Sequence, residues 1–365
     1  MKNAKNVSVI QKLLEDHESP SKVEIIEDKS CRPHTHIFFL KTHKTASSTI
    51  MNILFRFGES QNLTFALPIH NVSQFFYPND FKAYFVQDFA MKNWRHFDIM
   101  CHHMRFQLTE VEKIMPNDTF YFTIMRNPVS LMESSFSYYK SLEVFAKASS
   151  LEEYLNNSYK YYTRKTGNRH YGKNLIAFDL GLDQNEPETP KHFKLTQNAV
   201  ETMFNLVLIT EYFDESLILL KDALCWSFDD ILSFPLNNRN ATSRKILSEM
   251  TQEKIKTWNQ LDWQLYVYFN KSFWEKVDMF GQDRMQREVQ ELRRRRIAQS
   301  EICLQGQVDP KKVNDTLLKP FQAGLSRILG YNLKPGLNKT ERLLCYRMVT
   351  PELQYSKLLY NKQNQ

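Results

Sequence analysis

Residues 38–50 read FFLKTHKTASSTI, an apolar run followed by a turn rich in hydroxyl groups and by the start of a helix. The apolar run at 36–42 is short and has polar flanks, which is typical of a buried parallel strand. Apolar side chains then recur at helical spacing at Ile50, Ile53, Leu54 and Phe57. Gly58 is expected to end this helix. The stretch therefore predicts a strand, a turn centred on Lys44 and a helix.

The same step from strand to helix recurs further along the chain. Apolar runs at 96–103, 119–128 and 206–211 are each followed by a segment with helical periodicity. Alternation of this kind predicts an α/β fold in which helices flank a parallel sheet.

The chain of 365 residues is expected to form one domain behind a polar leader. Residues 1–30 hold no aromatic side chain and predict a stem or a disordered N-terminal segment. Residues 31–365 predict a single domain. Within it we expect an α/β nucleotide-binding core at 31–235 and a mainly helical extension at 236–365.

The turn after the first strand has the composition of an anion site. Ligands of parallel sheets bind beyond the carboxyl ends of the strands, near helix N-termini whose free amide groups favour anions. Here Lys44 stands among several hydroxyl side chains, whereas an ordinary helix start needs only one hydroxyl as its N-cap. A net charge of +7 favours an anionic ligand. The stretch contains no glycine, so it is not the loop of a P-loop ATPase.

A second phosphate-binding element is predicted downstream. In IMRNPVSLMESSF, Arg126 ends a strand and Ser134 follows two turns into the next helix, whose N-terminus faces the same ligand. We expect Lys44 and Arg126 to lie on one edge of the sheet and to face one cleft.

The two elements together resemble the donor site of sulfotransferases. Residues 43–48, HKTASS, are similar to the 5′-phosphosulfate loop of these enzymes, P-K-S-G-T-T, with alanine in place of glycine. The aromatic residue that stacks on adenine in many members would fall at Thr49, so the adenine contact stays unassigned. The resemblance implies a P-loop-like sulfotransferase fold and the donor 3′-phosphoadenosine 5′-phosphosulfate, without a metal ion. Donor contacts are then expected at Lys44, Thr45, Ala46, Ser47, Ser48, Thr49, Arg126 and Ser134.

Longer motifs resemble one family in particular. FLKTHKTASST, RNPVSLMESSFSYY, FDLGLD, ILGYNL and VTPELQY are similar to the galactose 3-O-sulfotransferase family, which includes galactosylceramide sulfotransferase. The similarity runs from about residue 31 to about residue 360. It implies transfer of a sulfuryl group to the 3-hydroxyl of a terminal β-galactose on a glycolipid or a glycoprotein glycan. Which acceptor is used stays open, and nucleic acid is not an expected partner.

Sulfuryl transfer needs a cation at the leaving phosphate and a base for the sugar hydroxyl. Lys44 is expected to supply the cation. His102 ends the second strand, where related sulfotransferases place a catalytic histidine or glutamate, and is therefore the first candidate for the base. His103 is the alternative, because a one-residue shift in a strand turns the neighbouring side chain inward. His43 is expected to orient the sulfate or the acceptor.

Three further segments have a functional and an ordinary interpretation. Arg239, Arg244 and Lys245 would contact the nucleotide, or belong to a solvated loop. The aromatic and amide side chains of residues 169–183 would bind a galactose, or the aromatic ones would belong to the hydrophobic core. The arginines of 292–296 would attract anionic membranes, or lie on a solvated helix face.

Two other classes of function share parts of this pattern. A nucleotide-dependent kinase would need acidic metal ligands near Lys44, and no DxD-like or Walker B carboxylate is evident. A non-catalytic glycan-binding relative would be expected to have lost Lys44 or His102, and both are present.

Glycosylation sequons and cysteines favour the secretory lumen. The sequence has nine Asn-x-Ser/Thr sequons, where chance gives roughly three. Five cysteines fit one or two disulfides and at least one free thiol, with Cys303 and Cys345 as the preferred pair. Because no run of about 18 apolar residues is present, we expect a type II Golgi membrane protein whose anchor is absent from this sequence. The sequence leaves the oligomeric state open, with a homodimer as one alternative. The sequons begin at Asn6, Asn62, Asn71, Asn117, Asn156, Asn240, Asn270, Asn314 and Asn338.

Overall fold

The structure, a computed structural model, describes residues 31–89, 96–186, 189–239 and 246–364. At its centre lies a four-stranded parallel sheet with the strand order β2-β1-β3-β4. The predicted α/β fold is confirmed, since each strand falls inside one of the four apolar runs of the sequence. The strands are β1 (Ile37–Leu40), β2 (Ile99–Met100), β3 (Phe120–Met125) and β4 (Leu206–Ile209).

Helices fill most of the rest of the chain. Those of the first part are α2 (Ser47–Ser60), α3 (Leu108–Val111), α4 (Pro128–Tyr138), α5 (Glu143–Ala146), α6 (Leu151–Asn156), α7 (Ser158–Tyr161), α8 (Leu175–Asp179), α9 (Pro190–Met203), α10 (Phe213–Ala223) and α11 (Phe228–Ile231). Those of the second part are α12 (Glu249–Trp258), α13 (Gln260–Phe280), α14 (Gln282–Cys303), α15 (Lys339–Val349) and α16 (Glu352–Gln363).

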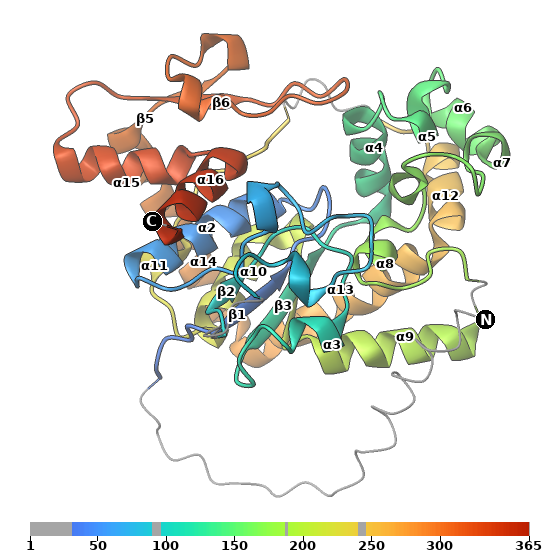
Figure 1. The fold of residues 1–365 in the computed structure, drawn as a ribbon, viewed down its shortest axis with the longest axis horizontal. Helices are drawn as coiled ribbons and strands as arrows, with labels where there is room; N and C mark the ends of the chain where they lie inside the picture. The colour runs from blue at the N-terminus through green and yellow to red at the C-terminus, as the bar shows by residue number, and fades with distance from the viewer. Residues whose placement is uncertain (1–30, 90–95, 187–188, 240–245, 365) are drawn as a thin grey trace, which may run out of the picture.

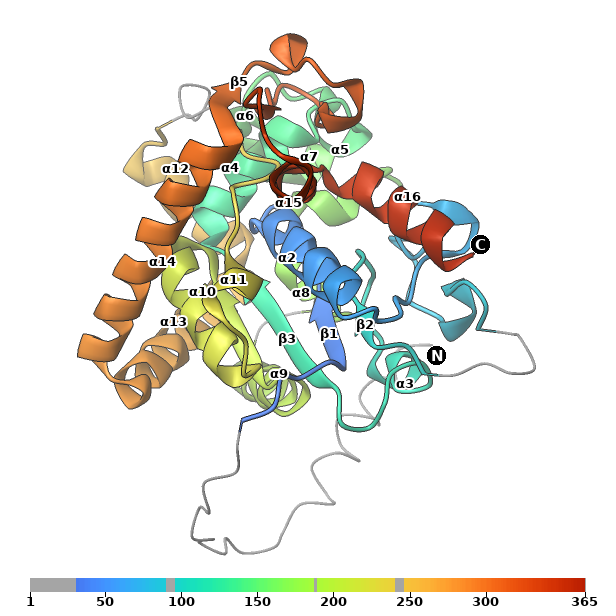
Figure 2. The same ribbon diagram turned by 90° about the vertical axis from the view of Figure 1, so that its left-hand side faces the viewer.

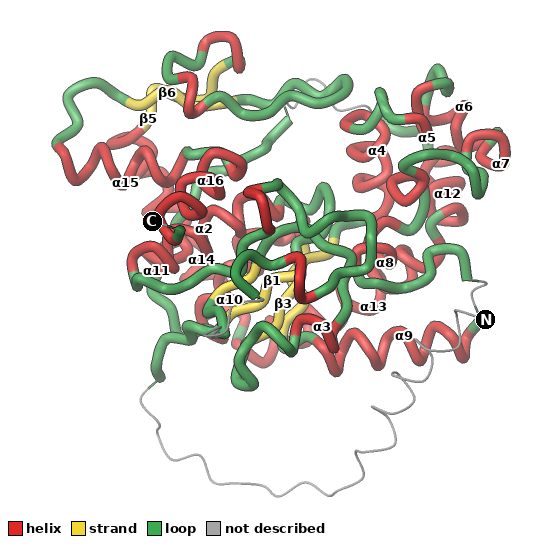
Figure 3. The backbone as a smooth tube through the Cα atoms, in the orientation of Figure 1, coloured by secondary structure: helices red, strands yellow, loops and turns green. Residues whose placement is uncertain are grey.

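The sheet is buried between helices (Figure 1, Figure 3). α10 and α13 contact β4, and α14 packs on α10. α2 contacts α15 and α16, so the last helices of the chain pack against the first helix that follows β1 (Figure 2). Every side chain of β1 is fully buried, which is why this strand reads as a continuous apolar run.

The strand order creates a crevice at the centre of the sheet. β1 lies between β2 and β3, and Leu40 near its carboxyl end pairs with Thr123 of β3. The chain therefore leaves β1 toward one edge of the sheet and later returns to its other side. Ligands of such sheets bind outside the carboxyl ends of the strands at this reversal. Lys44 follows β1 and Arg126 follows β3, so the two lie on the same edge, as the sequence predicts.

Two local predictions differ from the structure. Gly58 does not end the first helix, because α2 continues to Ser60. A Cβ atom at Gly58 would stand 2.3 Å from the ring of Phe65, so this glycine allows close packing. The extension at 236–365 is mainly helical, but it also holds an antiparallel pair of strands, β5 (Leu304–Val308) and β6 (Gly330–Leu333).

Two disulfides close the fold. Cys303 pairs with Cys345, as predicted, and Cys31 pairs with Cys225. Cys101 is a buried free thiol. Among the described residues, no helix combines the length and the apolar character needed to cross a membrane. The predicted stem at 1–30 lies outside the described residues.

The sequon asparagines differ in exposure. Asn71 and Asn270 are half-buried, and Asn6 and Asn240 lie outside the described residues. The exposed ones are Asn62, Asn117, Asn156, Asn314 and Asn338.

Candidate active site

The turn between β1 and α2 is held in a strained shape by its own hydroxyl groups. Thr42 Oγ1 donates to Ile124 O of β3 at 2.6 Å, and Ser47 Oγ donates back to Thr42 O at 2.8 Å. Lys44 and Ala46 have left-handed backbones, with φ of 60° and 62°. Each such non-glycine residue costs about 1–2 kcal/mol, and strain of this kind clusters at functional sites. Ala46 thus has a left-handed backbone at the position where the similar phosphosulfate loop of sulfotransferases has glycine.

These bonds leave the N-terminus of α2 open. The turn hydroxyls donate to carbonyl groups, and no side chain within the described residues caps the first amides of α2. Uncapped amides at a helix N-terminus attract anions.

A cleft of about 720 Å³ opens above this turn, which is large enough for a nucleotide and part of an acceptor. It is strongly basic, because Lys41, Arg239 and Arg296 line it together with Lys44 and Arg126. The candidate site residues that line it are His43, Lys44, Thr45, Ala46, Ser47, Ser48, Thr49, Arg126 and Ser134. His103 also lines it.

Lys44 and Arg126 lie next to each other in the cleft. Arg126 Nη1 donates to the backbone oxygen of Lys44 at 2.7 Å, and Lys44 Nζ lies 3.6 Å from the ring centre of Tyr138. Burial, and then the positive charge of Arg126, lower the pKa of Lys44 from 10.5 to about 7. An anion bound between the two side chains would favour the charged form of Lys44.

Arg239 is a further cation of the cleft. Its Nη2 atom pairs with Glu133 Oε2 at 2.5 Å, whereas its buried Nη1 atom has no partner among the described residues. A buried guanidinium nitrogen without an acceptor is costly, so this atom suits an anionic ligand. Arg244 and Lys245, the other candidates in this loop, lie outside the described residues.

The arginines of 292–296 do not form one unpaired basic face. Arg293 and Arg296 both pair with Asp214, and the two arginines between them pair with Glu291. Only Arg296 of this run lines the cleft.

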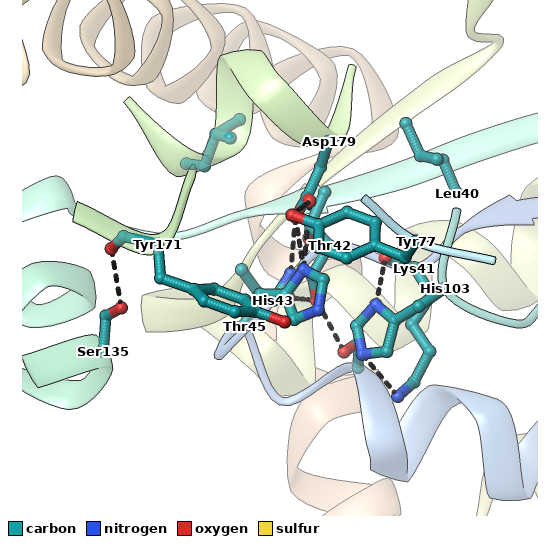
Figure 4. Close-up of polar contacts among 12 residues, drawn as sticks. Leu40, Lys41, Thr42, His43, Thr45, Tyr77, His103, Ser135, Tyr171 and Asp179 are labelled. Atoms are coloured by element: carbon teal, nitrogen blue, oxygen red, sulfur yellow. Dashed lines mark hydrogen bonds and ion pairs between the residues drawn. The ribbon is translucent and has the colours of Figure 1, made fainter. Parts of the chain in front are cut away.

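His43 is oriented by a buried carboxylate (Figure 4). Both oxygens of Asp179 lie 3.0 Å from His43 Nδ1, and Asp179 Oδ2 also accepts from the His43 amide at 2.8 Å. The hydroxyl of Tyr77 donates to Asp179 Oδ1 at 2.8 Å. Because a carboxylate only accepts, Nδ1 carries the hydrogen, and in the neutral ring Nε2 then holds the lone pair. That Nε2 atom is buried and has no hydrogen-bond partner in the described part of the chain.

The short helix α8 places Asp179 at this point. Asp262 of α13 accepts two amides of the first turn of α8, at 2.9 and 3.0 Å. At the other end, the amide of Phe106 donates to Asp179 O at 3.0 Å. Gly181 has φ of 81°, and a Cβ atom there would lie 2.1 Å from the oxygen of Phe106. The glycine of the FDLGLD motif therefore allows the approach that fixes Asp179.

His103 lines the cleft, but both of its ring nitrogens are bonded. Nδ1 lies 2.8 Å from Lys41 O, and Nε2 lies 3.0 Å from Lys41 Nζ. Its ring stacks on that of His43, with centres 3.8 Å apart and planes inclined by 6°.

His102 points away from this cleft. Its Nε2 atom bonds to Ser356 Oγ at 2.7 Å, and the side chain lines a smaller cavity of about 260 Å³ instead. Burial, and then Lys41, lower the pKa of His102 to about 3. The structure thus brings His43 and His103 together with Lys44 and leaves His102 outside.

Lys41 and two acids, Asp179 and Glu352, are site residues that the sequence analysis did not single out. Glu352 Oε2 lies 2.9 Å from Lys41 Nζ and accepts from Ser48 Oγ at 2.5 Å. Burial raises the pKa of Glu352, but the charge of Lys41 and the bond from Ser48 outweigh it and hold the pKa below its ordinary value. Both acids lie within motifs of the family resemblance, FDLGLD and VTPELQY. An acidic residue inside such a motif was the available signal.

Aromatic side chains form one wall near His43. Tyr139 and Tyr171 stack with ring centres 3.8 Å apart, and both line the cleft. Tyr171 and Asp179 both come from the segment 169–183. Among the described residues, no group of three His, Cys, Asp or Glu side chains is arranged to hold a metal ion.

Comparison with known proteins gives relatives over almost the whole chain. Galactose-3-O-sulfotransferase 2 of Sus scrofa is 46% identical over 337 residues, which cover 91% of this chain and 85% of that protein. Galactosylceramide sulfotransferase of Bos taurus is 45% identical, over 89% of this chain and 78% of that protein. Galactose-3-O-sulfotransferase 4 of Homo sapiens is 36% identical, over 92% of this chain and 84% of that protein.

The sequence model of one family matches residues 5–363, and its description is galactose-3-O-sulfotransferase. This match agrees with the basic cleft at the strand reversal and with the motifs that line it. The chain therefore belongs to the galactose-3-O-sulfotransferase family, a family of enzymes that sulfate galactose.

Proposed function

We propose that the protein transfers a sulfuryl group from 3′-phosphoadenosine 5′-phosphosulfate to the 3-hydroxyl of a terminal β-galactose. The observation that carries this proposal is the meeting of two kinds of group in one cleft. Lys44 and Arg126 supply positive charge at the carboxyl ends of β1 and β3, and the His43–Asp179 pair faces the same space.

The donor is proposed to bind along the first turn. Lys44, the uncapped amides of α2 and the hydroxyls of residues 45–49 suit its 5′-phosphosulfate, and Arg126 and Ser134 suit its 3′-phosphate. Arg239, with a buried nitrogen that lacks an acceptor in the described residues, adds a further contact. The cleft thus offers the charges that a donor with several phosphate and sulfate oxygens requires.

His43 is proposed as the general base in place of His102. It accepts the proton of the galactose 3-hydroxyl at Nε2 while the hydroxyl oxygen forms its bond to sulfur. The bond from sulfur to the bridging oxygen breaks, and Lys44 neutralises the charge that this oxygen keeps. Asp179 stabilises the imidazolium that results, as in a hydrolase triad.

The other two histidines fit this role less well. Both nitrogens of His103 are bonded to Lys41. His102 faces the smaller cavity, and a pKa of about 3 makes it a weak base at neutral pH. His43 alone of the three combines a lone pair, an orienting carboxylate and a place in the cleft.

The acceptor is proposed to be a galactose-terminated glycolipid, such as a galactosylceramide, or a glycoprotein glycan. Tyr139 and Tyr171 offer an aromatic surface next to His43 on which a sugar ring can lie. The names of the relatives include both a galactosylceramide sulfotransferase and galactose sulfotransferases without a named lipid. The sequons and disulfides support a place in the secretory lumen, and we propose a Golgi location as a type II membrane protein. A homodimer stays a prediction.

Replacement of Arg126 tests the donor site. Arg126→Ala should weaken binding of 3′,5′-adenosine bisphosphate by about 2–5 kcal/mol, because a bidentate phosphate contact is lost. Titration calorimetry measures this, with Arg164→Ala, an exposed arginine outside the cleft, as the matched control. Nucleotide affinity unchanged in Arg126→Ala would refute the assignment.

Transfer of labelled sulfate to a panel of galactosylceramide, lactosylceramide, N-acetyllactosamine and core-1 glycans then identifies the acceptor.

A further inference from the structure

The stacked imidazoles of His43 and His103 raise a question of charge. If His43 accepts a proton during turnover, a positive ring forms 3.8 Å from the centre of its neighbour. A second positive charge on His103 would oppose that step, because like charges at this distance disfavour each other's protonation. The state of His103 therefore matters to the base that we propose.

The hydrogen bonds of His103 fix its state. The carbonyl oxygen of Lys41 can only accept, so Nδ1 of His103 carries the hydrogen. The ammonium of Lys41 can only donate, so Nε2 of His103 is the acceptor and carries no hydrogen. One residue thus binds both ring nitrogens, and His103 is a neutral imidazole with no free lone pair.

The ammonium of Lys41 is held in place by a carboxylate. Lys41 is almost fully buried, and Glu352 Oε2 lies 2.9 Å from its Nζ atom. A buried ammonium needs such a partner. Because α16 supplies this carboxylate, the C-terminal helix stabilises the charge that acts on His103.

We propose that Lys41 and His103 are positioning residues, in which Lys41 keeps His103 neutral so that His103 supports the ring of His43 without competing for its proton. This inference rests on the proposed role of His43 as base. It also gives the turn a second role, since Lys41 directly follows β1 and His43 begins the turn.

The ionisable groups around the pair are few and known. His103 faces Lys41, His43 and His102, and burial before all of these lowers its pKa well below the ordinary value. His43 faces Asp179 of α8, Tyr77, Tyr139 directly after α4, and Tyr171, and it also interacts electrostatically with His170. Removal of Lys41 takes away the positive charge that lies 3.0 Å from the Nε2 atom of His103.

Nitrogen NMR of the unmodified protein tests the state of His103 directly. The ring of His103 should show a hydrogen on Nδ1, a bare Nε2, and no protonation between about pH 5 and 8. A His103 ring that titrates in this range, or that carries its hydrogen on Nε2, would overturn the proposal.

The pH dependence of turnover tests the role of Lys41. Lys41→Met would leave Glu352 without its cation, so it is made together with Glu352→Gln, and the unmodified protein is the control. In the double variant His103 can bind a proton. Turnover at acid pH should then decrease through two protonations, one of His43 and one of His103, instead of one. Each pH unit below that ionisation then costs an extra factor of about ten. The control keeps Lys41 and should show one proton.

Addition of His103→Phe completes the test, because phenylalanine keeps an aromatic ring but cannot titrate. The second protonation should disappear from the pH profile of turnover in the triple variant. If the double variant shows one proton, or if the triple variant keeps two, the proposal is wrong. If His43→Ala turns over normally, the proposed base is wrong instead, and the NMR result on His103 is unaffected by that outcome.

Discussion

Lys44 combines a left-handed backbone, a buried ammonium and a neighbouring arginine. Each feature is unfavourable in isolation, since the backbone is strained and the charge is desolvated beside another positive charge. An anionic ligand reverses the last two effects. We therefore expect Lys44 to be charged when the donor is bound, so that donor binding is coupled to protonation of its side chain.

The pH dependence of nucleotide binding follows from this linkage. With a pKa of about 7, Lys44 is mostly neutral at pH 8 in the free protein, and binding of 3′,5′-adenosine bisphosphate should raise that pKa. Binding at pH 8 should take up about one proton, and affinity should fall by up to about tenfold per pH unit above pH 7. Calorimetry in buffers with different ionisation enthalpies measures the uptake.

Lys44→Arg provides the control, because arginine stays charged throughout this range. Its affinity should not fall with pH. Binding by the unmodified protein without proton uptake at pH 8 would show that Lys44 does not meet the phosphates.

At the scale of elements, the core of the fold could be predicted because local pattern decides it. β1 is buried on both faces, so four apolar residues and a polar turn were enough to identify it. The pair β5 and β6 was missed because Leu304–Val308 holds mostly exposed polar side chains and a glycine, which have no strand periodicity. Gly58 was misread because a contact with Phe65, not a local signal, requires it.

The helix α8 shows how an element can position the carboxylate that orients the proposed base. Asp262 is fully buried, and burial raises its pKa to about 7 although amides of α8 donate to it. Asp262→Asn leaves one oxygen where there were two, so one amide of α8 loses its acceptor. We expect a loss of about 1–3 kcal/mol in the free energy of unfolding, measured by denaturant titration.

The same substitution should lower turnover by displacing Asp179 at the other end of α8, while nucleotide affinity stays unchanged. Asp283→Asn, at an exposed position of α14, is the matched control and should change neither quantity. If Asp262→Asn destabilises the protein but keeps full turnover, then α8 does not position the groups that take part in the reaction.

At the scale of the whole molecule, the site is assembled from segments far apart in the sequence. Glu352 bonds to Ser48 across 304 residues, and Asp179 bonds to His43 across 136. The order and spacing of the motifs identified the family and the turn around Lys44. They favoured His102 as the base, whereas the contacts of the folded chain lead us to propose His43, because the choice among the three histidines depends on partners that are distant in sequence.

Turnover of His43→Ala, measured with saturating donor and beside His102→Ala, tests the central claim most directly. A general base typically contributes 10²–10⁴-fold, so we expect His43→Ala to lose about that factor in kcat. Its affinity for 3′,5′-adenosine bisphosphate should stay normal, since Lys44 and Arg126 remain. His102→Ala should keep turnover within about tenfold, since His102 faces the smaller cavity. Near-normal turnover in His43→Ala, with the loss found in His102→Ala instead, would contradict the account.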